Sequence, residues 1–150
     1  MSDCALKSRI GDAMKAAMKA REKERLGTIR LIQSEMKRIE VDERIELDDA
    51  RVVAVLERMR KQRKDSITQY EAAGRQELAD VEAREITVIE EFLPAPLSDE
   101  DIQALIDKAI ADTGADSMRA MGQVMAQIKP EIQGRADAAQ VSALVKARLQ

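Results

Sequence analysis

Histidine is absent from this sequence, and aromatic residues and cysteine are nearly absent. Among 150 residues there is no His, no Trp, one Tyr, one Phe and one Cys. Without His, the chain lacks the side chain that titrates near neutral pH, which excludes His-based catalytic triads, His-assisted acid–base catalysis and most zinc ligand sets. The lone Cys4 can neither close an intrachain disulfide nor build a cysteine metal site. Most hydrolase mechanisms are therefore excluded, and neither a metal nor a cofactor is expected.

Long apolar runs are missing as well. The longest, Val52–Leu56, has five residues, far short of the roughly 20 that a membrane-spanning helix needs. The first residues also lack the basic stretch followed by an apolar one that marks a signal peptide. Together with the single cysteine, which suits a reducing compartment, these features predict a cytoplasmic protein without a membrane partner.

Hydrophobic residues instead make up 45% of the sequence, most of them aliphatic, and charged residues make up 35%. Because Phe92 and Tyr70 are the only aromatics, the core must be aliphatic, with Met filling its gaps. Apolar residues recur at helical spacing almost throughout, and no alternating pattern persists over the length of a strand. We therefore predict an all-α protein of about seven helices.

Four of these helices are expected before the prolines near residue 95. They are predicted over residues 3–20, 22–44, 49–74 and 78–92. Asp48 is placed to cap the third, Gly74 marks its end, and Pro94 must stop the fourth because proline lacks the backbone donor. The acidic stretch 42–49 lacks the glycine turn and closing Glu of a calcium loop, so we interpret it as a connector between helices.

The segment Leu93–Leu97 contains two prolines and separates two helical blocks. We predict two helical subdomains joined by this Pro-rich connector: an N-terminal helical domain over residues 1–93, the connector over 94–97 and a C-terminal three-helix domain over 98–150. In the last part, Ser98 and Asp101 resemble a capping box. The three helices there are expected from Ser98 to Gly114, from Asp116 or Ser117 to a close at Pro130 and Gly134, and from a cap at Asp137 onward.

Charge alternates in blocks along the first part of the chain. The formal charge is +6 over residues 7–38, −5 over 39–50, +5 over 51–64 and −6 over 65–97. Neighbouring antiparallel helices can pair such blocks, which is a purely structural interpretation. The whole chain carries a net charge of −3, so the field of the molecule argues against a DNA partner, and nucleic-acid contact would need local basic patches.

Two groups of cations in the first part are candidates for phosphate binding. On the second helix, Arg30, Lys37 and Arg38 lie nearly opposite the apolar stripe and form either a solvated face or a basic binding stripe.

On the third helix, Arg63 falls within the apolar stripe itself, where a guanidinium needs a partner. One interpretation is an ion pair with a carboxylate such as Glu85. The other is a phosphate-reading cluster made by Arg60, Arg63 and Lys64, because guanidinium groups match phosphate geometry.

The last part offers fewer candidates. Gly122 stands in a predicted helix, where glycine costs about 1 kcal/mol relative to Ala, so we expect it to admit a close approach by another helix or a ligand. The connector from Lys129 to Asp137, which includes Gly134 and Arg135, leads into a helix start that could meet an anion. Because Asp137 can cap that helix with its own carboxylate, a cap alone is the alternative.

Four ordered motifs resemble the GatB/YqeY family and span nearly the whole chain. They are Lys61–Ile67, Tyr70–Arg75, Phe92–Pro94 with Leu97–Ser98, and Met121–Met125 with Gly134–Asp137. Residues 98–150 are similar to the tail domain of the B subunit of the glutamine-dependent aspartyl/glutamyl-tRNA amidotransferase, a part of that enzyme that engages tRNA.

The resemblance implies an all-helical protein that binds tRNA or a tRNA-handling enzyme. It also implies the family label of a carbon–nitrogen ligase with glutamine as amido-N-donor, although nothing in this chain matches that enzyme's glutaminase or catalytic cradle. We therefore expect a non-catalytic accessory protein. The RNA-binding candidates are Arg60, Arg63, Lys64, Arg30, Lys37, Arg38, Gly122, Lys129, Gly134 and Arg135.

Two other functions remain open from the sequence. One is a helical protein–protein adaptor that docks through the Met-rich sixth helix and an exposed Leu31. The other is an enzyme that transfers an amide group in its own right, for which no catalytic motif is visible.

Overall fold

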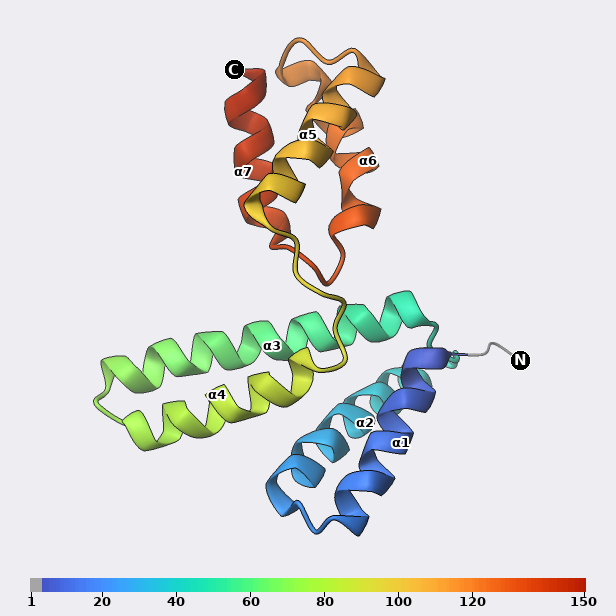
Figure 1. Ribbon diagram of the computed structural model, residues 1–150, viewed down its shortest axis with the longest axis vertical. Coiled ribbons are helices and arrows are strands. Elements are labelled where there is room, and N and C mark those ends of the chain that lie inside the picture. Colours follow the sequence, from blue (N-terminus) through green and yellow to red (C-terminus); the bar gives the residue numbers. More distant parts are fainter. Residues whose placement is uncertain (1–3) are drawn as a thin grey trace. The chain divides into compact units, whose positions relative to one another are not determined.

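The computed structural model describes residues 4–150, and within that range it contains seven α-helices, one short 3-10 turn and no strands (Figure 1). The all-α prediction is confirmed, while the predicted start of the first helix at residue 3 lies outside the described residues. The helices are α1 (Ala5–Lys19), α2 (Lys23–Glu43), α3 (Asp49–Ala72), α4 (Gln76–Glu90), α5 (Asp99–Thr113), α6 (Met121–Ile132) and α7 (Ala138–Leu149). Residues 4–93 and 94–150 each form a compact unit, named here the N-terminal unit and the C-terminal unit.

The N-terminal unit consists of two helical hairpins, α1 with α2 and α3 with α4 (Figure 1). Each helix contributes an apolar stripe to one shared core, as the periodicity of the sequence predicts. The fully buried side chains of this core are aliphatic: Ile10, Ile29, Ile32, Leu47, Val52, Leu56 and Ile89. Burial of these stripes holds the four helices together, because isolated helices of this length are marginal in water.

The connector between α2 and α3 is held by carboxylates on both sides. Asp48 caps α3 by accepting a hydrogen bond from the Arg51 backbone N–H at 2.8 Å. The Glu40 carboxylate accepts from the Leu47 N–H at 3.1 Å and pairs with Lys7 of α1 at 2.8 Å. The interpretation of the acidic stretch as a connector is confirmed, since residues 44–48 join the two helices.

Asp49 ties the start of α1 to the start of α3. Its Oδ1 accepts hydrogen bonds from the Leu6 backbone N–H and from the Cys4 Sγ, both at 3.0 Å. These bonds lower the pKa of Asp49, whereas burial, reinforced by the bond to Asp49, raises the pKa of the Cys4 thiol. The thiol is therefore held in its protonated form.

The fourth helix ends at Glu90, two residues earlier than predicted. The N–H groups of Phe92 and Leu93 instead bond to the carbonyls of Ile89 and Glu90, three residues back, which makes a tight terminal turn. This turn buries both side chains in the core. Arg9 fixes it from outside by donating to the Glu91 carbonyl oxygen at 2.8 Å.

The C-terminal unit is a three-helix assembly in which the predicted caps of α5 and α7 are present. The capping box is present, because Asp101 N–H donates to Ser98 Oγ at 3.1 Å and Ser98 N–H donates to Asp101 Oδ2 at 3.3 Å. Gly114 ends α5 in the left-handed conformation with φ of 64°, and Asp137 caps α7 by accepting from the Ala139 N–H at 3.0 Å. The core is again aliphatic and includes Ile106, Val124, Ile128, Val141 and Val145.

The sixth helix differs from prediction at its start. A 3-10 turn over Met118–Ala120 precedes it, and the Ser117 side chain makes no capping bond. At the other end α6 closes at Ile132, between Pro130 and Gly134 as predicted, with Pro130 itself inside the last turn. Proline removes only the bond to the carbonyl of the exposed Ala126, which faces water, and the buried Ile132 keeps the last turn on the core.

Candidate nucleic-acid interface

Arg63 of α3 is committed to an ion pair inside the N-terminal unit. Its Nε donates to Glu85 Oε2 of α4 at 2.7 Å, and a second guanidinium nitrogen donates to the Met59 carbonyl oxygen at 3.2 Å. The two charged side chains are only 14% and 20% exposed, so the pair is shielded from water. The alternative that paired Arg63 with Glu85 is confirmed, and Arg63 joins α3 to α4 within the N-terminal unit.

The neighbouring Arg60 and Lys64 are placed differently. They stand one helical turn apart on the flank of α3 next to its outer face, because residues four apart share a face. Lys64 is exposed and Arg60 half-buried, and within residues 4–150 neither forms an ion pair. The structure thus separates the predicted cluster of three into one internal cation and two that remain available on the surface.

A carboxylate beside Arg63 is raised in pKa. Glu82, also on α4, is half-buried, and burial together with the negative charge of Glu85 raises its pKa, while Arg63 acts in the opposite direction. The Arg63 guanidinium therefore attracts the charged forms of both carboxylates, although it is hydrogen-bonded only to Glu85. The arrangement explains why a cation is tolerated within the apolar stripe of α3.

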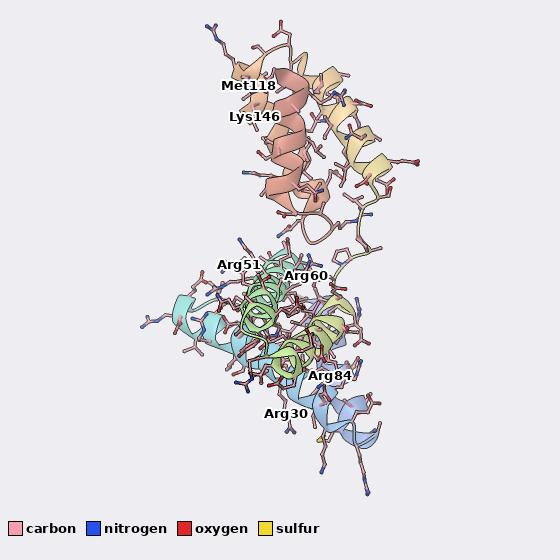
Figure 2. The ribbon with its side chains drawn as sticks, turned by 90° about the vertical axis from the view of Figure 1, so that its left-hand side faces the viewer. Arg30, Arg51, Arg60, Arg84, Met118 and Lys146 are labelled. Atoms are coloured by element: carbon pink, nitrogen blue, oxygen red, sulfur yellow. The ribbon has the colours of Figure 1, made fainter. Side chains whose placement is uncertain are left out.

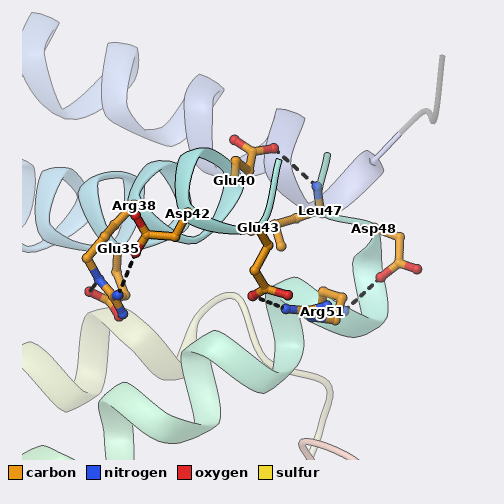
Figure 3. A network of polar contacts seen from close by, with 8 residues as sticks. All are labelled: Glu35, Arg38, Glu40, Asp42, Glu43, Leu47, Asp48 and Arg51. Atoms are coloured by element: carbon orange, nitrogen blue, oxygen red, sulfur yellow. Dashed lines mark hydrogen bonds and ion pairs between the residues drawn. The ribbon is translucent and has the colours of Figure 1, made fainter. Parts of the chain in front are cut away.

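The basic stripe of α2 is partly neutralised, as Figure 3 shows. Arg38 pairs with Glu35 and also reaches Asp42 at 3.3 Å. The hydrogen bond between Arg38 and Glu35 lowers the pKa of the Glu35 carboxyl and raises the pKa of the Arg38 guanidinium. Arg30 and Lys37 are exposed and form no ion pair within the described part of the chain, so two of the three predicted stripe residues remain available.

A shallow cleft of about 270 Å³ lies between α2 and α3 and is lined by both signs of charge. Its carboxylates include Glu35 and Glu43, and its cations include Arg51 and Arg58. Arg51 donates to Glu43 at 2.7 Å across the cleft (Figure 3). Among residues 4–150, no group of three His, Cys, Asp or Glu side chains could hold a metal ion. Of the ion pairs that line this cleft, Arg51–Glu43 joins α3 to α2, while Arg38 pairs with carboxylates of its own helix.

The unpaired candidate cations of α2 lie apart from those of α3. Figure 2 shows Arg60 and Arg30 on opposite sides of the N-terminal unit. Each side presents its own small group, Arg60 with Lys64 on one and Arg30 with Lys37 on the other. A polyanion lying on one side of the N-terminal unit would contact one of these groups, not both.

In the C-terminal unit, the candidates Gly134 and Arg135 lie where residues 95–97 meet the end of α6. Arg135 donates from Nε to the Ala95 carbonyl oxygen at 2.9 Å, and its own carbonyl oxygen accepts from the Leu97 N–H at 2.9 Å. Gly134 is buried and adopts φ of 75°, a left-handed conformation that favours glycine. Arg135 thus holds residues 95–97 against the end of α6, and Asp137 occupies the helix start that had been considered as an anion site.

The remaining two candidates of that unit are exposed. Lys129 lies on the outer side of α6 and forms no ion pair among the residues that the structure describes. Gly122 lies in the first turn of α6, and a Cβ added there would meet nothing within 4 Å. The expectation that Gly122 admits another helix of this chain is wrong, because the position faces open space.

The sequence analysis missed one group of cations at the turn between α1 and α2. Lys15, Lys19, Arg21 and Lys23, named here the basic tip, are all exposed and form no ion pair within residues 4–150. Lys15 and Lys19 share a face of α1, but Arg21 and Lys23 lie beyond its end, so a search along single helices does not group the four. A count of charge across the turn could have found them.

Comparison with known proteins places the chain among relatives. The model of a family described as YqeY-like protein matches residues 7–149. Altered inheritance of mitochondria protein 41, mitochondrial, from Kluyveromyces lactis is 33% identical over 102 residues, which cover 66% of this chain and 55% of that protein. The chain therefore spans little more than half the length of this curated relative. None of the helices among residues 4–150 is both long and apolar enough to cross a membrane.

Proposed function

The chain belongs to the YqeY-like protein family, and from this premise we propose that it is a non-catalytic accessory protein that binds tRNA through phosphate contacts, or else binds a tRNA-handling enzyme. The observation that carries the proposal is the pair of cations on the flank of α3, Arg60 and Lys64, which no carboxylate among residues 4–150 neutralises. Five other cations of α2 to α4, namely Arg25, Arg38, Arg51, Arg63 and Arg84, are held in ion pairs, whereas Arg60 and Lys64 keep their charge for a partner.

The chemistry of these side chains fits a folded RNA. A guanidinium fork and an ammonium one turn apart can contact neighbouring phosphates, and they carry no base-specific information. The chain has only Tyr70 and Phe92 as aromatics, and Phe92 is buried, so the half-buried Tyr70 would be a lone ring and successive unpaired bases have no row of rings to stack on. Recognition by shape and phosphate contacts is the mode that double-helical RNA offers.

The family resemblance supports a contribution from the last part of the chain. Lys129 is the exposed cation on the stretch that is similar to the amidotransferase tail, while Arg135 positions the segment before α5. In this proposal residues 1–93 and 98–150 are separate domains and residues 94–97 are the connector. The cytoplasmic location, inferred from the single cysteine, is part of the same proposal.

Binding of tRNA by the intact chain tests the proposal. We expect Arg60→Ala/Lys64→Ala to weaken binding about tenfold at moderate salt and to reduce the slope of log K against log salt by about 2. The matched control is Lys108→Ala/Lys146→Ala, which removes two exposed cations of the C-terminal unit. Arg63 stays unchanged in both variants, because its loss would break the internal pair with Glu85.

For the parent chain, four phosphate contacts would give a slope of roughly −3 to −4. Circular dichroism confirms that each variant keeps its helices. An affinity that does not change with salt, or equal weakening by the control variant, would contradict phosphate recognition by α3.

The adaptor alternative has its own supporting observation. Leu31 and Val41 on the outer side of α2 are 48% and 61% exposed, next to the free cations Arg30 and Lys37. The Met-rich α6 supports it less, because Met125 is buried and Met121 half-buried against the core. An acidic protein partner would be retained after nuclease treatment and lost with Leu31→Glu. The amide-transfer alternative stays a prediction, tested by release of ammonia from glutamine.

A further inference from the structure

The basic tip is a concentration of charge that its own unit leaves uncompensated. The two carboxylates nearest to it in sequence are engaged elsewhere, since Glu22 lies 3.7 Å from Arg25 and Glu24 pairs with Arg84 at 2.5 Å. The last carboxylate before it on α1, Asp12, makes no ion pair within the described residues. Four cations therefore surround one exposed turn that holds a single carboxylate, Glu22, so the tip carries an excess of positive charge.

Arg21 occupies a conformation that arginine disfavours. Its φ is 59°, in the left-handed region, whereas Gly74, Gly114 and Gly134 fill the other left-handed turns apart from Arg44. The Cβ of arginine is crowded in this conformation and glycine is not. A glycine would close the turn between α1 and α2 more easily, so the side chain of Arg21 serves something other than the turn.

Lys23 also opposes the local structure. It is the first residue of α2, where a cation meets the positive end of the helix dipole, and α2 has no side-chain cap. Lys19, at the last residue of α1, is the one tip residue whose charge the dipole favours. Arg21 and Lys23 both disfavour the local backbone structure. Where no structural benefit compensates for such a residue, we expect it to serve binding.

The uncharged surface of the tip narrows the choice of partner. Ala16, Met18 and Ala20 are exposed there, and Met18 is 49% exposed. One methionine between alanines offers little apolar area for insertion into a lipid surface and no ring for base stacking. Ammonium and guanidinium groups on a convex turn fit a row of phosphates.

We propose that the basic tip is a second contact site for the phosphate backbone of double-helical RNA, in addition to the site on α3. This inference rests on the proposed function. Figure 1 shows the tip at the end of the α1–α2 hairpin away from the start of α3. Since Asp49 holds the other end of α1, the tip lies about 22 Å from that anchor, the length of a helix of 15 residues.

The test uses the full chain, tRNA and a fully paired RNA hairpin as probes. Lys15→Gln/Lys19→Gln/Lys23→Gln is compared with Lys108→Gln/Arg119→Gln/Lys146→Gln, which removes three exposed cations elsewhere. We expect the tip variant to bind both RNAs at least tenfold more weakly at moderate salt and to lower the salt slope by about 3, with no comparable change in the control.

Arg21→Gly separates a binding role from a structural one. Relief of the left-handed conformation should raise the unfolding midpoint while RNA binding falls two- to fivefold. A purely structural role for Arg21 predicts no loss of RNA binding.

The possible failures are distinguishable. If Arg60→Ala/Lys64→Ala weakens binding and the tip variant does not, the tip inference is overturned and the proposed function stands. If the parent chain binds neither RNA, both fall. Loss of binding to phosphatidylserine vesicles in the tip variant, with RNA affinity unchanged, would identify a lipid surface as the partner and also overturn the inference.

Discussion

The two units of this protein hold their helices together by different means. In the N-terminal unit, charged pairs such as Lys7–Glu40, Arg51–Glu43 and Arg63–Glu85 join one helix to another, in addition to the aliphatic core. In the described C-terminal unit, Arg148–Asp107 is the one ion pair between side chains. Its helix ends are fixed by the capping box of α5, by the Asp137 cap of α7 and by glycines in the left-handed conformation.

The difference extends to the turns. Both left-handed arginines, Arg21 and Arg44, lie in the N-terminal unit, whereas the left-handed turns of the C-terminal unit use Gly114 and Gly134. Both units keep exposed cations that form no ion pair among residues 4–150, such as Lys15 in one and Lys108 in the other. The comparison teaches that, among the described residues, arginines in the left-handed conformation, which opposes their local preference, are confined to the N-terminal unit.

Truncation of each core gives the largest expected effect. Ile106→Ala in α5 removes a fully buried side chain, and such changes cost about 2–5 kcal/mol, enough to unfold a unit of 57 residues. If the units fold independently, hydrogen exchange should rise in α5 to α7 and stay unchanged in α1 to α4.

Ile32→Ala in α2 is the reciprocal variant and should affect the N-terminal unit alone. Ile106→Val serves as the mild control, with a cost of about 1 kcal/mol. Simultaneous loss of protection in both units after either truncation would mean that they unfold as one.

The shielded ion pair comes next in size. Arg63→Met leaves Glu85 without its partner beside Glu82, and we expect the free energy of unfolding to fall by roughly 1–3 kcal/mol. Arg148→Met in the C-terminal unit breaks an exposed pair and should cost less than about 0.5 kcal/mol. Urea denaturation measures both.

Arg63→Met/Glu85→Leu is the informative double variant, because replacing both charges removes the unpaired carboxylate. It should recover most of the lost stability. A double variant as unstable as Arg63→Met would show that packing, not charge, makes Arg63 necessary.

Substitutions at the left-handed turns should change stability by smaller amounts, and in opposite directions in the two units. Arg21→Gly and Arg44→Gly should each stabilise the N-terminal unit by up to about 1 kcal/mol, because glycine adopts positive φ without a steric penalty. Gly114→Ala should destabilise the C-terminal unit by about 1 kcal/mol for the same reason. Thermal unfolding of the three variants measures these changes. A neutral Gly114→Ala would contradict the steric argument for glycine at positive φ.

Acid titration gives the smallest effect and concerns the N-terminal unit alone. The bond to Lys7 lowers the pKa of Glu40 from its ordinary 4.5, so its stabilisation is present above that value and is lost as pH falls through the lowered pKa. Burial raises the pKa of Glu82, so its charge costs stability above the raised pKa and costs nothing below 4.5.

Unfolding free energies at several pH values test this pair. Glu82→Gln should stabilise the protein at pH 7 and make no difference at pH 4, whereas Glu40→Gln should destabilise it at pH 7 and lose that effect only at stronger acidity. Parallel pH profiles for the two variants would contradict the opposite shifts.

Most of the helical pattern could be predicted from the sequence, because apolar spacing and local caps decide it. Asp48, Ser98 and Asp137 all cap the helices expected of them. The course of α6 past Pro130 could not be predicted, since it depends on which carbonyl faces water and on the burial of Ile132. Such facts arise only from tertiary packing.

The candidate site was less accessible to sequence reasoning. Charge blocks predicted that opposite stretches would pair, and Arg63–Glu85 and Glu43–Arg51 do so. Periodicity cannot reveal which cation of a cluster is used internally, so Arg63 could not be separated from Arg60 and Lys64 before their surroundings were known. The basic tip escaped because the turn between α1 and α2 brings Arg21 and Lys23 beside Lys15 and Lys19, which lie on another helix.

The bond between Cys4 and Asp49 makes this thiol a reporter of the junction where α1 meets α3. The Sγ is bonded to Asp49 and its pKa is raised, so a maleimide dye should label the half-buried thiol more slowly while that bond is in place. Asp49→Ala should therefore speed up labelling, and no second thiol in the chain confuses the signal.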